Sequence, residues 1–392
     1  MEVKLLQPVK VVCTDDLGET LVDIMQTAGY SRPLMVTDSF VGSMPLVVAA
    51  RTKLEQVGVD VAVFDQVKPD PLCETVESGV EAFEAHKADS IIAIGGGSSM
   101  DGARGINIVR VNGGSIIEYT DPAKPIAPCN GMIAVPTTAG TGSEMSNALV
   151  VTEGSTGRKL AVLADPAVSE YAVLNADLML TLPAKMTIAC GLDAFCHAAE
   201  GYLSRMASPV TDAICEKAMF LLYNYLPRAV ANGQDREARE RVMVASTLAG
   251  WMLNNAGTIA GHSIAHVLGA KYHIVHGEAV GYALPAVMEF VAPVRAHKVR
   301  EIGQILGAVY PENAPDEQVA IIASRAFKDF RDRMLGLHPV EDYGISVEEL
   351  VSNAQAVVDE RFAGNTPRDI DLQACPRYRP CSRMSQEHFR CD

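Results

Sequence analysis

The segment that decides the fold reads Ser90-Ile-Ile-Ala-Ile-Gly-Gly-Gly-Ser-Ser-Met-Asp101. Its first five residues form a mostly apolar run of the length expected for a buried strand. Three glycines follow at once. Glycines between a strand and a helix let the backbone approach a ligand closely, and the helix N-terminus offers free N–H groups to a phosphate. The segment therefore predicts a strand, a tight turn and a helix, with a candidate phosphate-binding site in the turn.

The glycine run matches neither of two common phosphate-binding fingerprints. The dinucleotide fingerprint requires a third glycine at position 100, where this chain has Met100, and it usually follows the first strand of the domain. A P-loop requires Gly-Lys-Ser/Thr after the glycines, and that sequence does not follow here. A turn without a ligand therefore stays open as an alternative to a cofactor-binding turn.

Strands and helices alternate around this segment. Residues 34–38 and 59–64 are strand candidates, and residues 46–56 between them have helical spacing. Apolar residues also recur at helical intervals over 75–86, and residues 132–135 form a further strand candidate. This alternation is typical of a parallel sheet with helices on both faces.

A second loop of small residues follows the strand at 132–135. Residues 136–144, Pro-Thr-Thr-Ala-Gly-Thr-Gly-Ser-Glu, offer hydroxyl groups and glycines suited to a pyrophosphate or a nicotinamide ribose. Two such loops after neighbouring strands mark the edge where an open α/β sheet binds ligands. Asp38 ends an earlier strand, where an acid binds ribose hydroxyls and repels a 2′-phosphate, so NAD is favoured over NADP. An aspartate that only caps a turn is the alternative.

Beyond about residue 182 the pattern changes to helical runs, which predicts a domain boundary there. We expect helices at 186–203, 209–224, 238–255, 262–268, 279–290, 298–306, 317–335 and 347–361. Asp193 and His197 lie four residues apart, as do His262 and His266, so each pair shares one face of its helix. Their neighbours are mostly apolar or small, and a buried polar group without a partner is costly. We therefore expect a shared divalent metal, although each pair alone could be a surface pair or contain a satisfied core histidine.

Composition and charge exclude several classes of protein. A chain of 392 residues suggests two domains. Its net charge of -15 provides no basic stripe, which argues against nucleic-acid binding. No apolar stretch approaches a membrane span, and Met1 to Lys4 include an acid where a signal peptide has bases, so we expect a cytoplasmic protein. The nine cysteines are dispersed and are expected to be reduced thiols.

With these motifs in hand, the chain resembles the iron-containing (group III) alcohol dehydrogenases. The resemblance covers about residues 30–368 and rests on the segments 95–101, 136–144, 191–198 and 261–277. It implies a dehydroquinate synthase-like fold, with a Rossmann-like α/β domain over 1–182, a helical metal-binding catalytic domain over 183–368, and the active site in the cleft between them. Residues 369–392 lack apolar periodicity and differ from the closing helix of the family, so we expect a poorly ordered tail.

The resemblance also implies which residues form the site. The residues that match the family's metal ligands, for Fe²⁺ and alternatively Zn²⁺, are Asp193, His197, His262 and His276. The residues expected to bind NAD are Asp38, Gly96, Gly97, Ser98, Asp101, Thr137, Thr138, Thr141 and Lys159. His266, one helical turn after His262, is expected to relay a proton to solvent. The residues expected to line the substrate pocket are Trp251, Leu253 and Asn254.

The implied activity is hydride transfer between NAD(H) and a small primary alcohol or aldehyde, with the metal acting as a Lewis acid on the substrate oxygen. A homodimer or a larger homo-oligomer is expected. Alternatives among enzymes are a reductase for aldehydes that carry a sulfonate, phosphonate or carboxylate, a zinc-dependent polyol (glycerol-type) dehydrogenase, and a dehydroquinate-synthase-like lyase. The intact set of one aspartate and three histidines favours iron and a simple aldehyde. A non-catalytic NADH-binding scaffold is the alternative outside the enzymes.

Two residues depart from the family pattern. Arg104 stands where members usually carry a lysine, and it keeps the positive charge. Cys196 precedes a metal ligand where a hydroxyl residue is common, and we interpret it as a small buried thiol.

Overall fold

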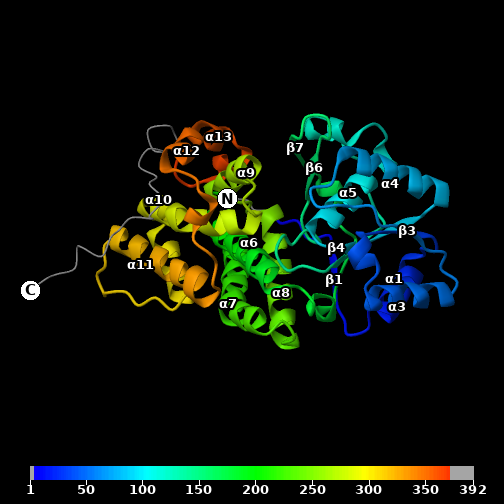
Figure 1. The fold of residues 1–392 in the computed structure, drawn as a ribbon, viewed down its shortest axis with the longest axis horizontal. Coiled ribbons are helices and arrows are strands. Elements are labelled where there is room, and N and C mark those ends of the chain that lie inside the picture. The colour runs from blue at the N-terminus through cyan, green and yellow to red at the C-terminus, as the bar shows by residue number, and fades with distance from the viewer. Residues whose placement is uncertain (1–3, 371–392) are drawn as a thin grey trace, which may run out of the picture.

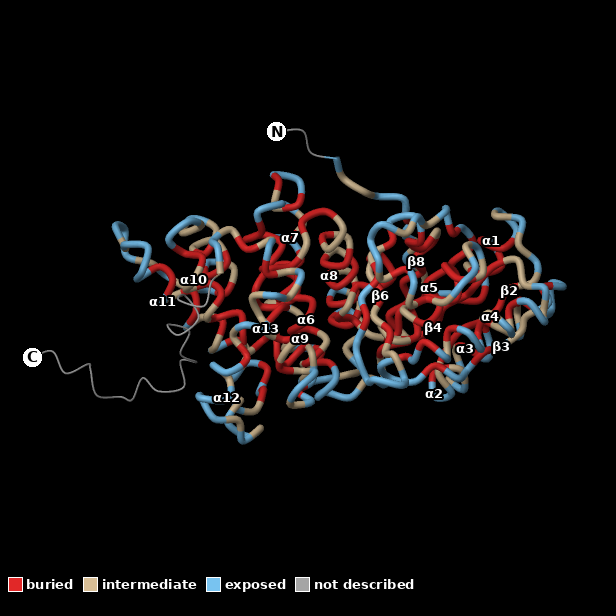
Figure 2. Tube along the Cα trace, turned by 90° about the horizontal axis from the view of Figure 1, so that it is seen from above, coloured by how far each residue is buried: buried red, intermediate tan, exposed pale blue. Residues whose placement is uncertain are grey.

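The computed structural model describes residues 4–370 of the chain. An α/β half built around a parallel sheet and a half made of helices lie side by side along the longest axis of the molecule (Figure 1). Each half has a buried interior, and exposed residues lie on its outside (Figure 2). This arrangement confirms the expected fold class, a Rossmann-like sheet domain joined to a helical domain.

Within the described residues, the main sheet has six strands in the order β1-β8-β5-β4-β2-β3, and all neighbouring pairs are parallel. The strands are β1 (Lys10–Cys13), β2 (Pro33–Val36), β3 (Ala62–Phe64), β4 (Ser90–Gly95), β5 (Met132–Pro136) and β8 (Tyr171–Leu174). A separate antiparallel hairpin consists of β6 (Ala148–Thr152) and β7 (Lys159–Leu163). The helices of this half are α1 (Leu17–Ala28), α2 (Ser39–Gly42), α3 (Pro45–Gln56), α4 (Cys73–His86) and α5 (Gly97–Asn112).

Helices cover both faces of the sheet. Successive side chains of a strand point to opposite faces. Ile91 of β4 therefore belongs to the apolar cluster shared with α4 and α5, whereas Ile92 belongs to the cluster shared with α1 and α3. Strands β2, β4, β5 and β8 are buried along their whole length. This two-sided burial explains why the predicted strands are continuous apolar runs instead of alternating ones.

The direction in which successive strands are added to the sheet reverses between β2 and β4. From β2 the chain goes first to β3 on one side and then to β4 on the other. The loops that follow β2 and β4 therefore diverge at the carboxyl edge of the sheet, which is a topological switch point where such sheets bind ligands. Asp38 follows β2, and Gly95 to Gly97 follow β4. The fold thus brings together the two segments that the sequence predicts to bind a cofactor.

A contiguous apolar core joins the helices of the second half. These helices are α6 (Ala184–Leu203), α7 (Pro209–Ala231), α8 (Arg236–Asn255), α9 (Ala260–Tyr272), α10 (His276–Ile305), α11 (Asp316–Lys328), α12 (Val347–Ser352) and α13 (Ala354–Asp359). Short 3₁₀ segments are η1 (Ile116–Thr120), η2 (Asp165–Ala167), η3 (Ala176–Met179), η5 (Val340–Tyr343) and η6 (Arg361–Asn365), and a π-helical turn, η4, spans Asp329–Met334. No helix among the described residues combines the length and the apolar character needed to cross a membrane.

The structure also contains elements that the sequence patterns do not indicate. Strand β1 is a sheet edge with three of its four residues exposed, so it carries little apolar signal. The two helices expected at 279–290 and 298–306 both lie within α10, and non-helical backbone at Arg295, two residues after Pro293, forms a kink between them. The hairpin β6–β7, the helix α1 and the strand β8 are further elements that the sequence patterns do not indicate.

The last strand of the sheet ends at Leu174, and α6, the first helix of the second half, begins at Ala184. The tail that the sequence predicts to be poorly ordered, residues 369–392, lies largely outside the described residues.

Candidate metal centre and cofactor-binding loops

Three helices of the helical half bring a carboxylate and two imidazoles together. Asp193 lies on α6, His262 lies on α9, and His276 begins α10. One donor atom from each lies within 4.8 Å of the other two. The Oδ1 atom of Asp193 is 3.4 Å from Nε2 of His276 and 3.7 Å from Nε2 of His262. Residues that are 69 and 83 positions apart from Asp193 therefore converge on one point.

His197 lies one turn after Asp193 on α6 and faces the same site. Its Nε2 atom is 3.7 Å from Oδ1 of Asp193, and its ring stacks on that of His262 with the centroids 4.5 Å apart. His197 nevertheless lies outside the set of residues whose donor atoms are all within 4.8 Å of one another. The structure thus brings three of the four predicted metal ligands into one cluster and places the fourth against its edge.

Two candidate ligand atoms of this cluster lack hydrogen-bond partners. Among the described residues, Oδ1 of Asp193 and Nε2 of His262 are buried without a hydrogen bond, and so is Nδ1 of His197, the ring nitrogen that does not face Asp193. The separations of 3.4–3.7 Å within the cluster are too long for hydrogen bonds. Leaving such a group unsatisfied costs about 1–3 kcal/mol. Imidazole nitrogens and a carboxylate are the ligands that a first-row divalent metal accepts, so these residues fit such an ion.

The electrostatics of Asp193 and His197 favour the protonation states that bind a metal. Burial lowers the pKa of His197 to about 4, so this imidazole is neutral near pH 7. Burial alone would raise the pKa of Asp193, but His197 and His276 outweigh it and hold this pKa below its usual range. An ionised carboxylate beside a neutral imidazole is ready for coordination, because metal binding does not first have to remove a proton from either group.

Sequence reasoning missed Glu200, a fully buried residue on α6. One of its oxygens, Oε1, lies 2.8 Å from Nδ1 of His262, and the other accepts the backbone N–H groups of Ile259 at 2.7 Å and His262 at 3.3 Å. Gly261 has no side chain because a Cβ there would lie 2.2 Å from the Glu200 carboxylate. Glu200 follows Asp193 by two helical turns, and an acid on the same face of a buried helix is the signal that could have identified it.

Glu200 controls the electrostatics of His262. Burial lowers the pKa of His262, but the Glu200 carboxylate outweighs burial and raises this pKa to about 10. Because Glu200 holds the Nδ1–H group, the Nε2 atom of His262 faces Asp193 and is the atom that would bind a metal, with release of its proton.

His266 lies between the metal cluster and the solvent. Its ring stacks on His276 with the centroids 5.4 Å apart, and its side chain is 35% exposed. The Nδ1 atom lies 2.8 Å from Oε1 of Glu360, whose second oxygen accepts the Ser263 hydroxyl at 2.8 Å. A partly exposed imidazole beside the cluster, held by a carboxylate, has the position needed for proton transfer between the site and water. Glu360, which the sequence analysis did not identify, belongs to the segment between α13 and η6.

The two loops predicted to bind a cofactor pack against each other at the switch point. A Cβ atom on Gly97 would lie 2.8 Å from the Thr141 side chain, and one on Gly96 would lie 3.2 Å from Thr138. The glycines therefore allow a contact that side chains would prevent. Gly96 is the N-cap of α5 and makes no side-chain cap hydrogen bond, so the first N–H groups of this helix remain available to an anion. This geometry fits a dinucleotide pyrophosphate.

The loop after β5 also connects the cofactor site to the metal helix. A Cβ atom on Gly140 would lie 2.8 Å from the Cα atom of Cys190, one turn before Asp193 on α6. In the same loop, Gly142 touches the backbone of Gly250 on α8. Glycines at these positions let the loop lie directly on both helices. The candidate dinucleotide site and the candidate metal centre thus share one loop.

Other predicted cofactor residues have structural contacts of their own. Asp38 caps α2, because its Oδ1 atom accepts the N–H groups of Phe40 and Val41 at 2.9 Å. Lys159 forms an ion pair with Asp70 at 2.6 Å. Thr137 is buried at the end of β5, and Ser98 lies in the first turn of α5. Cofactor binding by these residues stays a prediction.

Asp101 connects α5 to the chain around β6. It accepts hydrogen bonds from the Ser143 hydroxyl and the Val150 N–H group, both at 3.0 Å. Burial raises its pKa to about 6. The fully buried Arg104, one of the two departures from the family, lies beside it and donates to the carbonyl groups of Ala148 and Ala167. These contacts indicate that the pair holds α5 in place.

The three residues predicted to line the substrate pocket lie where α8 meets the sheet half or the helical core. Asn254 accepts the N–H group of Asn147 and donates to the Met145 carbonyl, both at 2.7 Å. Trp251 packs against the small apolar cluster that contains Met145, and Leu253 packs against the core of the helical half. Asn254 thus holds the chain after the 136–144 loop against α8. A substrate contact by these residues stays a prediction.

Comparison with known proteins identifies relatives along almost the whole chain. Residues 8–176 match the family model described as iron-containing alcohol dehydrogenase, and residues 187–375 match the C-terminal model of the Fe-containing alcohol dehydrogenase family. The chain is 38% identical over 368 residues to the NAD-dependent methanol dehydrogenase of Bacillus methanolicus, which covers 92% of each chain. It is 32% identical over 359 residues to the lactaldehyde reductase of Escherichia coli K12, which covers 90% of this chain and 92% of that one. A crystal structure of 1,3-propanediol oxidoreductase superposes with a TM-score of 0.89 at 29% identity and covers 96% of this chain and 98% of that one.

Proposed function

The chain belongs to the iron-containing alcohol dehydrogenase family, and from this premise we propose that it is an NAD-dependent oxidoreductase that interconverts small primary alcohols and aldehydes. The observation that carries the proposal is the cluster of Asp193, His262 and His276, in which the donor atoms of the two buried members, Oδ1 of Asp193 and Nε2 of His262, have no hydrogen-bond partner among the described residues. The contact of Gly140, in the 136–144 loop, with Cys190 of α6 supports a cofactor site next to this cluster. Relatives named for methanol, lactaldehyde and 1,3-propanediol support a small, uncharged substrate.

The residues of the cluster hold the metal in this proposal. Asp193, His262 and His276 bind a divalent iron, and His197 is the fourth ligand. When bound, the iron supplies Lewis acidity to the substrate oxygen and NAD carries the hydride. Glu200 keeps Nε2 of His262 pointed at the site by holding the Nδ1–H group. The same ligands accept Zn²⁺, so metal identity is tested by reloading the protein with either ion.

The cofactor lies at the switch point of the sheet in this proposal. The N-terminus of α5, from Gly96 to Ser98, binds the pyrophosphate, and the hydroxyls of the 136–144 loop bind the nicotinamide half. The Oδ1 atom of Asp38 caps α2, which leaves Oδ2, on the side of Gly95, for the ribose hydroxyls. This position supports NAD over NADP as the cofactor.

His266 moves the proton. With Nδ1–H held by Glu360, its Nε2 atom is free to accept a proton from the site and to release it to water. The stacking of His266 on His276 keeps this imidazole within the reach of a group bound at the metal centre.

We further propose that the protein is cytoplasmic and forms a homodimer or a larger homo-oligomer. The six cysteines described as free thiols support a reducing compartment. Light scattering of the purified protein tests the oligomeric state.

The activity is tested by NADH consumption. Protein stripped of metal and reloaded anaerobically with Fe(II) or Zn(II) is assayed with short neutral aldehydes, acidic aldehydes and polyols. We expect turnover with Fe(II) and neutral aldehydes that is lost in Asp193→Ala and kept in Asp23→Ala, a matched change at an exposed helical position. Metal-loaded protein that binds NADH but reduces none of these compounds would contradict the proposal.

A further inference from the structure

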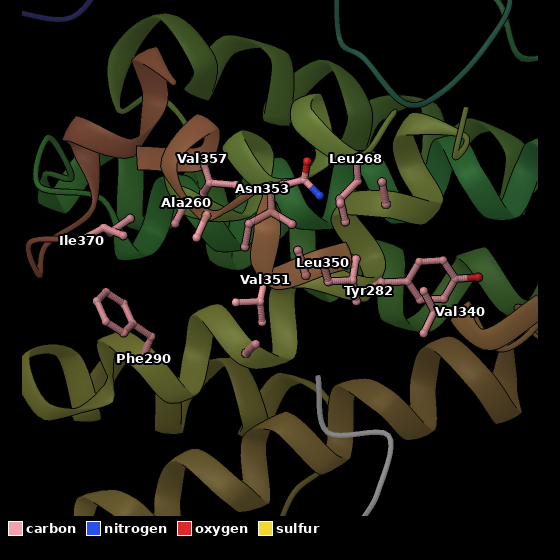
Figure 3. A pocket seen from close by; sticks show the side chains of 15 residues that line it. Ala260, Leu268, Tyr282, Phe290, Val340, Leu350, Val351, Asn353, Val357 and Ile370 are labelled. Atoms are coloured by element: carbon pink, nitrogen blue, oxygen red, sulfur yellow. The ribbon is translucent and has the colours of Figure 1, made fainter. Parts of the chain in front are cut away.

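A second apolar site lies in the helical half, away from the metal centre. It is a groove of about 160 Å³ between α9, α10 and the segment that contains α12 and α13 (Figure 3). Its lining is almost entirely apolar and includes Ile264, Leu268, Phe290, Val351, Val357 and Ile370. Ile264 and Leu268 lie on the face of α9 opposite to His262 and His266, because residues two positions apart point to opposite sides of a helix. The groove is therefore distinct from the candidate active site.

The described chain ends at this groove. Ile370 is both a lining residue and the last described residue. The preceding residues are held firmly in place. Arg368 donates to the Phe290 carbonyl at 3.0 Å, and its guanidinium lies over the Phe290 ring at 4.5 Å. Thr366, which is buried, accepts the N–H group of Ala260 at 3.1 Å. Whatever follows Ile370 in the sequence must therefore start at the edge of the groove.

We propose that the segment that follows Ile370 binds in this groove, with the Leu372 side chain as its main apolar occupant. Two residues of chain reach at most about 7 Å, so Leu372 remains close to the position of Ile370. It is the first large apolar residue after Ile370, and Ala374 adds a small one. A cavity of about 150 Å³ is large enough for a benzene molecule, so the groove has room for one leucine side chain and a small neighbour.

Binding of this segment would also steady the chain next to the proton-relay residue. Val357 of α13 lines the groove, and Glu360, three residues later, is hydrogen-bonded to His266. An occupant that packs against α13 restrains the segment that ends at Glu360. The docking proposal itself rests on the groove and on the chain end, and it does not depend on the proposed enzyme activity.

The test uses the full-length chain, because Leu372 lies outside the described residues and its substitution changes none of the residues that line the groove. Leu372→Asp is compared with the parent, with Leu372→Met, and with Phe389→Asp as a distant control. We expect Leu372→Asp to increase the fluorescence of a bound apolar dye several-fold and to speed amide hydrogen exchange in peptides from 347–359. Leu372→Met and Phe389→Asp are expected to match the parent. Equal dye binding and exchange in Leu372→Asp and the parent would overturn the proposal.

A photo-crosslinking amino acid at position 372 identifies what the segment contacts. We expect crosslinks within one chain, to peptides from α9, α10 and α12–α13, in a yield that does not depend on protein concentration. Crosslinks between two chains that increase with concentration would assign the groove to a second copy and overturn the proposal. Tight binding of the dye by the parent, at one molecule per chain, would show an open ligand site and would also overturn it.

Discussion

The Glu200 carboxylate on α6 lies 2.8 Å from Nδ1 of His262 on α9, and the same carboxylate caps the first turn of α9 through the N–H groups of Ile259 and His262. One buried side chain thus sets both the start of a helix and the orientation of a metal ligand on it. Because Asp193 lies on α6 as well, Glu200 fixes the position of one ligand-bearing helix relative to the other. Carboxylates that hold the distal nitrogen of a ligand histidine are a common part of metal sites.

Glu200→Gln should therefore weaken metal binding. A glutamine has one acceptor oxygen, so it cannot accept both the imidazole Nδ1–H group and the two backbone N–H groups. We expect the metal affinity to fall by roughly 10–100-fold, measured by competition with a chelator. Glu84→Gln, at an exposed position on α4, is the matched control and should leave the affinity unchanged. Parental affinity in Glu200→Gln would show that Glu200 only caps α9.

Removal of the metal should destabilise the parent protein but not a variant that cannot bind it. A ligand that binds only the folded state raises stability in proportion to the logarithm of its concentration over its dissociation constant. We expect the thermal midpoint of the parent to fall on chelation and to recover on addition of Fe(II). Asp193→Ala should show the same midpoint with and without metal. A midpoint of the parent that is insensitive to metal would argue against a metal on these residues.

Gly97→Ala should weaken NADH binding. The added Cβ would lie 2.8 Å from the Thr141 side chain, which can move but would push the two loops apart. We expect the dissociation constant for NADH to rise about tenfold, a loss of about 1.4 kcal/mol, with metal affinity unchanged. Gly364→Ala is the control, because a Cβ there meets no neighbouring atom within 4 Å. The measurement is a titration of NADH fluorescence, and unchanged binding would exclude the α5 N-terminus as the cofactor site.

His266→Ala should lower kcat while metal and NADH binding are kept. General acid–base groups contribute roughly 10²–10⁴-fold, so we expect a loss of that size at saturating substrate. Metal content and the NADH dissociation constant, measured on the same preparation, separate this effect from damage to the site. Full turnover by His266→Ala would eliminate the proton-relay role.

Asp101 should make the stability of the protein depend on pH. Burial raises its pKa from 3.8 to about 6, so the folded protein holds this proton more tightly than the unfolded chain. The contribution of Asp101 to the free energy of unfolding is fully present below the pKa of this residue in the unfolded chain, and it is lost as the pH rises through about 6. We expect the difference in unfolding free energy between the parent and Asp101→Asn to change by up to about 3 kcal/mol between these limits. Denaturant unfolding at several pH values measures it, and a constant difference would contradict the shift.

The sequence by itself determined the local elements and the kinds of chemistry. The apolar run Ser90–Ile94 and the glycines after it predict a buried strand and a tight turn, because these properties depend on residues adjacent in the chain. The four-residue spacing of Asp193 and His197 predicts a shared helix face for the same reason, and both lie on α6 as expected. Each of these features depends only on residues a few positions apart, so it can be identified without knowledge of the fold.

Only the tertiary structure decided which of these parts meet. Glu200 reaches the start of α9 across 62 residues, and Glu360 reaches His266 across 94. Strand β1 pairs with β8 from the far end of the sheet half, although its own residues are mostly exposed. Such contacts depend on how helices and strands pack, and packing is set by the shape and burial of many side chains together. No local pattern in the sequence carries that information.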